Sequence, residues 1–183
     1  MQFVFDERKA THAAAYLLAR GGGTMPYIKL IKLLYLADRE SLLETGYTIT
    51  GDRMVSMDKG PVLSRVYDHL VEEQQQPGIW QRFISPPENF CVSVRDEPAY
   101  ESLSDYEIGL LNQVFEKFGD WDRWALVEWT HGLPEWVDPR GSSLSIDPAV
   151  ILREAGRSDD EVRGIAAEVE AIRAFRQVAA MTR

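Results

Sequence analysis

The sequence predicts a mostly α (α+β) fold: a single globular helical domain with a small antiparallel β element of two to three strands and a C-terminal amphipathic helix. Three observations lead to this prediction. Apolar residues recur at helical spacing through most of the chain, and short β-type segments occur only between residues 54 and 94. Ser-x-x-Glu capping boxes at Ser104 and Ser158 each precede an apolar helical pattern. No internal repeat is visible, which excludes solenoid architectures.

Two helices are expected at the start of the chain. Residues 10–19 hold alanines and leucines at helical spacing, and the glycines at 21–23 end that pattern because glycine loses much conformational entropy in a helix. We expect Thr24 to cap a second helix, with Pro26 in a first turn where the missing N–H is tolerated. Residues 28–37 are apolar on nearly every side of that helix, which predicts a place at the centre of the domain.

The β element is expected in the next part of the chain. Residues 54–57 follow a Gly51-Asp52 turn signal and predict a strand. Residues 80–84 and 90–94 predict two antiparallel strands around a prolyl loop, and the three segments would form one small sheet. Between them, Gly60-Pro61 is expected to open a helix that runs from Val62 to about Glu73.

Capping signals organise the second half of the chain. The box at Ser104 opens a helix that ends at Gly119, and Asp120 is expected to cap the next helix, which reaches His131. An irregular stretch over 133–147 precedes a short helix at 148–154.

The long amphipathic helix then runs from Ser158 towards Ala180. Its expected inward residues are Val162, Ile165, Ala166, Val169 and Ile172. We expect residues 1–141 to form the main domain and residues 142–183 to be a helical extension packed on it.

Charge excludes several function classes. With 20 Lys and Arg against 29 Asp and Glu, the 183-residue chain has a net charge of −9. Such a surface repels phosphates and anionic lipids, so we expect no nucleic-acid partner for the chain alone and no membrane partner. The single cysteine, Cys91, cannot form an internal disulfide, and the N-terminus has no signal-peptide pattern. These features predict a cytoplasmic protein.

Catalytic and cofactor motifs are missing from the sequence. The histidines His12, His69 and His131 have no zinc-site spacing, and Gly21-Gly22-Gly23 lacks the strand and the Lys-Ser/Thr pair of a phosphate-binding loop. Cys91 stands in a β-type segment, as a buried structural thiol would. We therefore expect no catalytic residue, no metal and no cofactor, and the chain is predicted not to be an enzyme.

Three segments look less generic. In the first, Lys29 and Lys32 occur on the apolar helix just before Tyr35, and their heads are expected in water or against carboxylates. The second is a strand-to-helix corner at residues 59–62, followed by Tyr67, and the third is a Thr-His pair with a tryptophan five residues after the histidine. The candidate partner-binding residues are Lys29, Lys32, Tyr35, Lys59, Gly60, Pro61, Val62, Tyr67, Thr130, His131 and Trp136.

In this order, the three segments resemble the Panacea domain of SocA-like antitoxins, which occur in bacterial and phage-associated toxin–antitoxin systems. The resemblance covers about residues 10–139. It implies an antitoxin that needs no cofactor and neutralises a cognate protein toxin, encoded by an adjacent gene, through direct protein–protein binding. The negative charge would favour a basic toxin, and the five tryptophans would supply buried anchors, at least one of which is expected to be partly exposed.

Other functions remain possible alternatives at this point. A member of this family could act as a proteolytic adaptor that delivers the toxin to a protease. An enzyme that uses His131 with a nearby carboxylate is a second alternative. A DNA-binding regulator is disfavoured because the arginines of the last helix alternate with acidic residues. The oligomeric state is not predicted.

Overall fold

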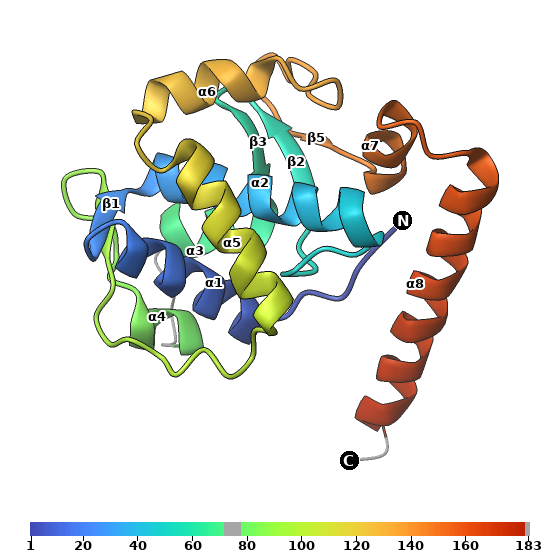
Figure 1. The fold of residues 1–183 in the computed structure, drawn as a ribbon, viewed down its shortest axis with the longest axis horizontal. Helices are drawn as coiled ribbons and strands as arrows, with labels where there is room; N and C mark the ends of the chain where they lie inside the picture. Colours follow the sequence, from blue (N-terminus) through green and yellow to red (C-terminus); the bar gives the residue numbers. More distant parts are fainter. Residues whose placement is uncertain (72–77, 182–183) are drawn as a thin grey trace.

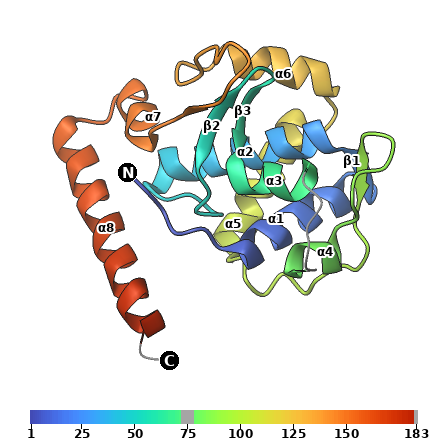
Figure 2. The ribbon, with the colours of Figure 1, turned by 180° about the vertical axis from the view of Figure 1, so that it is seen from behind.

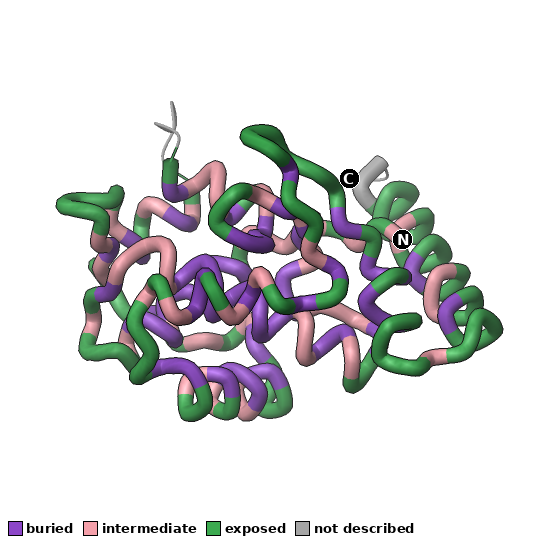
Figure 3. Tube along the Cα trace, turned by 90° about the horizontal axis from the view of Figure 1, so that it is seen from above, coloured by how far each residue is buried: buried purple, intermediate pink, exposed green. Residues whose placement is uncertain are grey.

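The computed structural model describes residues 1–71 and 78–181, with side chains up to residue 179. Within these residues, eight helices and five short strands are formed, and α2 lies at the centre, in contact with α1, α3, α5, α6 and α7 (Figure 1). The predicted fold class is confirmed: the chain is mostly helical, with small antiparallel sheets and a C-terminal helix. The buried residues concentrate in the middle of the trace (Figure 3).

Helix α1 spans Glu7–Arg20 and is capped by the Asp6 side chain, which accepts a hydrogen bond from Lys9 N. Helix α2 spans Tyr27–Thr45, and the apolar residues from Leu30 to Ala37 are buried, as their pattern predicts. The polar residues Lys32 and Asp38 are buried as well. The expected cap at Thr24 is wrong. Thr24–Pro26 forms strand β1, which pairs with β4 (Cys91–Ser93), and Pro26 occupies the N-cap position of α2.

The second sheet contains the predicted strand β2 (Met54–Met57), paired on one edge with β3 (Gly60–Leu63). The other edge pairs with β5 (Leu144–Ser145), from the stretch expected to be irregular. A helix starting at Val62 is therefore wrong. A two-residue turn between Met57 and Gly60 joins β2 and β3 into a hairpin. Helix α3 therefore begins after β3 and spans Ser64–Val71. The predicted end of this helix at Glu73 lies outside the described residues.

The predicted strand at residues 80–84 is also wrong. Ile79–Phe83 forms the short helix α4, which packs against α1 and buries Trp80 and Phe83. Only Ile84 forms a β-bridge, with Val94. The predicted single sheet of three segments is replaced by two separate sheets (Figure 2).

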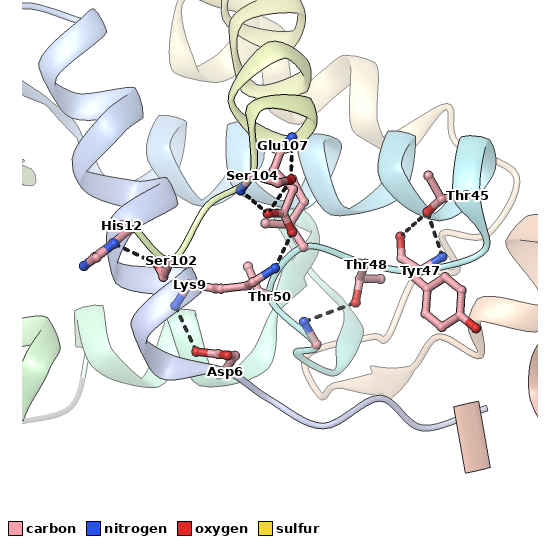
Figure 4. A network of polar contacts seen from close by, with 12 residues as sticks. Asp6, Lys9, His12, Thr45, Tyr47, Thr48, Thr50, Ser102, Ser104 and Glu107 are labelled. Carbon is pink, nitrogen blue, oxygen red and sulfur yellow. Dashed lines mark hydrogen bonds and ion pairs between the residues drawn. The ribbon is translucent and has the colours of Figure 1, made fainter. Parts of the chain in front are cut away.

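Helix α5 spans Asp105–Phe118 and begins with the predicted capping box. Ser104 Oγ accepts a hydrogen bond from Glu107 N, and Ser104 N donates to Glu107 Oε2 at 2.8 Å. Glu107 also accepts a hydrogen bond from Lys9 Nζ at 2.6 Å, which ties α5 to α1 (Figure 4). Helix α6 spans Arg123–His131 and is capped by Asp122, not by Asp120 as expected.

The tail contains α7 (Pro148–Glu154) and α8 (Asp159–Met181), and α8 lies at the side of the molecule (Figure 1). The capping box at Ser158 is confirmed. Val162 and Val169 are buried, but Ile172 is 42% exposed, so the expected inward face is wrong at that residue. No helix among the described residues is long and apolar enough to cross a membrane.

Candidate functional site

The three sequence segments meet at Gly60. This residue ends the turn of the β2–β3 hairpin with a φ of +85°, in the left-handed region that favours glycine. A Cβ atom at this position would lie 2.7 Å from Thr130 Oγ1, 2.9 Å from Lys32 Nζ and 3.3 Å from His131 Cδ2. Each of the three atoms comes from a helix, Lys32 from α2 and the other two residues from the end of α6. The absence of a side chain at Gly60 therefore allows α2, the hairpin and α6 to pack together.

Both lysines of the first segment donate hydrogen bonds to backbone carbonyls. Lys32 is 1% exposed, and its Nζ donates to Pro61 O at 2.7 Å. Burial lowers the pKa of Lys32 to about 7. Lys29 Nζ donates to Gly119 O at the end of α5, which satisfies a helix-terminal carbonyl. Neither lysine forms an ion pair with a described carboxylate, and for the buried Lys32 the predicted water or carboxylate partner is wrong. Lys29 is only partly buried.

The segment after α6 is bound to the hairpin through Trp136. Its Nε1 donates to Met57 O at 3.1 Å, and its ring stacks on the His131 imidazole with centroids 4.1 Å apart. Nε2 of His131 is buried without a hydrogen-bond partner among the described residues, and no described carboxylate forms an ion pair with it. Among the described residues, the His131 imidazole is thus in contact with the Trp136 ring and not within ion-pair distance of a carboxylate.

Tyr35 lies in a separate polar cluster that sequence reasoning missed. Its hydroxyl donates to Glu135 Oε1 at 2.8 Å, and Arg39 Nε donates to the same oxygen at 2.7 Å. Burial and the Glu135 carboxylate hold the pKa of Tyr35 well above its ordinary value. Glu135 immediately precedes Trp136 in the sequence, and that adjacency was the available signal. The cluster holds the segment after α6 against α2.

Two buried aspartates were also missed. Asp38 accepts hydrogen bonds from Ile49 N and Thr50 N, each at 3.0 Å, and fixes the loop after α2. Burial raises the pKa of Asp38 to about 7, although these hydrogen bonds oppose the shift. Asp52 caps α3 from a distance, because its carboxylate accepts hydrogen bonds from Arg65 N and Val66 N. Asp38 thus stabilises the loop that precedes the hairpin, and Asp52 stabilises the helix that follows it.

The remaining candidates lie in the hairpin and in α3 and differ in exposure. Pro61 and Val62 are buried in β3, whereas Lys59 is exposed at the turn and Tyr67 is half-buried in α3. Lys59 Nζ lies 5.7 Å from the centre of the Trp124 ring, within cation–π range. Trp124 is 51% exposed and Trp121 is 36% exposed, so the expectation of a partly exposed tryptophan is confirmed.

A pocket of about 220 Å³ opens beside this turn, between α2, the hairpin and α3. Four candidate residues line it: Lys32, Lys59, Val62 and Tyr67. Within the described part of the chain, no group of three or more His, Cys, Asp or Glu side chains is placed to hold a metal ion. The geometry thus offers a small pocket and exposed tryptophans next to each other, which is the arrangement of a binding surface.

The other two histidines have partners of their own. Nδ1 of His12 lies 2.7 Å from Ser102 Oγ (Figure 4), and the His69 ring stacks on Trp80 with centroids 5.1 Å apart. Burial lowers the pKa of both imidazoles. Neither histidine lines the pocket at the hairpin.

Comparison with known proteins gives one match. Residues 30–137 match the family described as "Antitoxin SocA-like, Panacea domain", which is more than half of the chain. The search found no matching curated protein and no matching solved structure. The matched range runs from α2 to the segment after α6 and includes the residues that meet at Gly60. The chain therefore belongs to the SocA-like antitoxin family, and residues 30–137 are its Panacea domain.

Proposed function

We propose that this protein is an antitoxin that neutralises its cognate protein toxin by direct binding, in the cytoplasm and without a cofactor. Family membership supports the antitoxin role. The observation that carries direct binding is a set of exposed side chains: Trp124, whose ring lies within cation–π range of Lys59 beside Gly60, and Trp121, which comes just before α6. We call Lys59, Trp121 and Trp124 the α6 surface. Because the chain carries a net charge of −9, we expect the toxin to be basic. Family membership implies that the adjacent gene encodes it.

The tryptophans of the α6 surface are suited to act as anchors. Trp121 packs edge-on against Phe118, with ring centroids 5.3 Å apart, and against Trp129 at 6.5 Å. Two cations, Lys59 and Arg123, lie within cation–π range of the Trp124 ring. Rings that are held in place by neighbours lose little conformational entropy on binding, and aromatic residues of this kind dominate the energy of most protein interfaces.

The first test is co-expression with the product of the adjacent gene. The neighbour alone should arrest growth, and the pair should grow and co-purify as a stoichiometric complex. A harmless neighbour, or a pair that never co-purifies, would rule out the proposal. The half-life of the toxin separates occlusion from the adaptor alternative, because delivery to a protease shortens that half-life and occlusion does not.

The second test is Trp124→Ala in the α6 surface. We expect toxin affinity to fall at least about 30-fold, since truncation of an interfacial tryptophan typically costs about 2 kcal/mol or more. Phe175→Ala is the matched control, because Phe175 is a 74% exposed aromatic residue on α8, outside the family match. Equal affinities of the two variants would place the interface elsewhere.

A further inference from the structure

The pocket beside the hairpin turn is small and has mixed chemistry. Its volume of about 220 Å³ is below the range of about 300–1,000 Å³ that small-molecule sites occupy, and is suited to one side chain. Ile28, Ile31 and Val62 supply apolar walls, and Lys32, Tyr27 and Tyr67 supply polar groups. The pocket opens next to Lys59, so it adjoins the α6 surface.

The polar groups of this pocket have unused hydrogen-bond donors. A lysine ammonium has three N–H donors, and Lys32 Nζ has one hydrogen-bond acceptor among the described residues, Pro61 O. The hydroxyls of Tyr27 and Tyr67 make no hydrogen bond within the described part of the chain. A ligand that fits the pocket must therefore present acceptor atoms on an apolar stem.

The charge in the pocket favours a ligand that carries a carboxylate. The Lys32 head is buried without a carboxylate partner, and burial lowers its pKa. The pocket's acidic residue, Asp58, is exposed at the rim, and its Oδ1 accepts a hydrogen bond from Gly141 N. A carboxylate brought into the pocket would form a charge-assisted hydrogen bond with the Lys32 ammonium, away from bulk water, where such pairs are strongest.

We propose that this pocket binds one aspartate or glutamate side chain of the cognate toxin, whose carboxylate pairs with Lys32 and whose methylene groups pack against Ile31 and Val62. The inference rests on the proposed antitoxin function and names the contact that gives it specificity. An apolar toxin side chain would leave the donors of Lys32 unsatisfied, so it would bind less well. The overall negative charge would steer a basic toxin to the surface, and this single carboxylate would define the binding register.

The first experiment needs no toxin. The full-length protein is titrated with 3-methylbutanoate, a carboxylate on an apolar stem, and separately with the neutral isostere 3-methylbutanamide, and is followed by NMR. The carboxylate should shift the amide resonances of Lys32, Val62 and Tyr67 saturably in the millimolar range and should raise the pKa of Lys32. Equal binding of the amide, binding elsewhere, or no binding would overturn the proposal.

The second experiment measures toxin affinity with paired lysine variants. Lys32→Met should weaken the complex at least about tenfold. Lys9→Met is the control, because Lys9 is also a hydrogen-bonded lysine on a helix, but lies outside the family match and does not line the pocket. Its affinity should stay within about twofold of the parent. Tyr67→Phe, which removes only a hydroxyl, should weaken binding about threefold and covers the case in which Lys32→Met fails to fold.

A scan of the toxin then identifies the partner residue. One Asp→Asn or Glu→Gln change in the toxin should weaken binding of the parent antitoxin and have little further effect on Lys32→Met, which is the signature of a direct pair in a double-mutant cycle. Unchanged affinity of both Lys32→Met and Tyr67→Phe would refute the pocket while leaving the antitoxin role intact. Failure of any complex to form would refute the antitoxin role, and the NMR titration would still report on the pocket.

Discussion

Gly60 has two separate reasons to be glycine. Its φ of +85° disfavours other residues, and its Cα is packed against Thr130, Lys32 and His131. Gly141 shares the first property, with a φ of +82°, but a Cβ added there would have no atom within 4 Å. The two glycines therefore allow backbone strain to be separated from crowding.

We expect Gly60→Ala to destabilise the protein by roughly 2–5 kcal/mol, since it combines left-handed strain with overpacking. Gly141→Ala should cost about 1–2 kcal/mol, from strain alone. Urea denaturation of both variants measures the difference. If the two losses were equal, close packing at Gly60 would have no energetic role.

Lys32 makes the stability depend on pH. Its pKa is about 7 in the folded chain and 10.5 as an ordinary lysine, so between these values the unfolded chain binds a proton that the folded chain lacks. The contribution of Lys32 to the free energy of unfolding should therefore rise with pH in this window, by up to about 1.4 kcal/mol per pH unit.

Lys32→Met should remove this rise, and Lys29→Met, which leaves Lys32 in place, should retain it. Urea denaturation of the three proteins across the window from pH 7 to 10.5 provides the measurement. A slope that survives in Lys32→Met would assign the dependence to other groups.

Among the helices, α3 and α6 differ in how far along the sequence the side chain that caps the N-terminus lies. Asp122 caps α6 locally and is exposed, and it accepts hydrogen bonds from Trp124 N and Ala125 N. Asp52 caps α3 from twelve or more residues upstream, is 3% exposed, and also accepts a hydrogen bond from Arg53 N. A buried cap leaves its donors unsatisfied when it is removed, because water cannot replace it.

Asp52→Ala should therefore cost about 2–4 kcal/mol, and Asp122→Ala about 1 kcal/mol. Thermal denaturation followed by circular dichroism compares the two variants. A smaller loss for Asp52→Ala than for Asp122→Ala would contradict the importance of the distant cap.

For the whole molecule, the question is whether the C-terminal extension belongs to the main domain. Strand β5 forms an edge of the second sheet, and Ile151 and Leu152 of α7 are fully buried in the main core. Helix α8 contributes less to that core, chiefly through Val162. The first part of the extension is thus built into the domain, and α8 is attached to its side (Figure 1).

We expect a chain that ends after residue 157 to unfold cooperatively at a lower temperature than the full chain. A chain that ends after residue 141 should lose its cooperative transition, since it lacks β5 and the core residues of α7. Thermal denaturation and size-exclusion chromatography of both truncations test this. A cooperative, monomeric 1–141 fragment would show that the Panacea domain folds without the extension.

Much of the fold was predictable because long helices carry many apolar residues that recur at the helical period. The apolar run in α2 and the capping box at Ser104 predicted their helices correctly. Short segments were ambiguous, since five residues at 79–83 fit either a strand or a single helical turn, and packing of Phe83 against His12 of α1 favours the helix. Strand β1 was missed because its partner, β4, lies far along the chain.

The sequence predicted which segments contribute to the candidate site, but not how their side chains contact one another. Local residue patterns and the family resemblance selected Lys32, Gly60 and His131, and the structure brings all three together. The burial of Lys32 and the role of Glu135 depend on contacts between residues 29 and 100 positions apart, which no local pattern encodes. Whether these residues bind a partner stays a prediction.

Local periodicity, caps and charge were sufficient to predict a mostly helical, acidic protein, and the resemblance of three ordered segments pointed to the SocA-like antitoxin family, which the family match shows. These properties depend on neighbouring residues and on composition, so they can be read along the chain. The donor-rich pocket at Lys32, the distant cap at Asp52 and the exposure of Trp124 follow from how the hairpin, α2, α3 and α6 pack. Packing brings together side chains that are remote in sequence, so only the folded structure could show these three features.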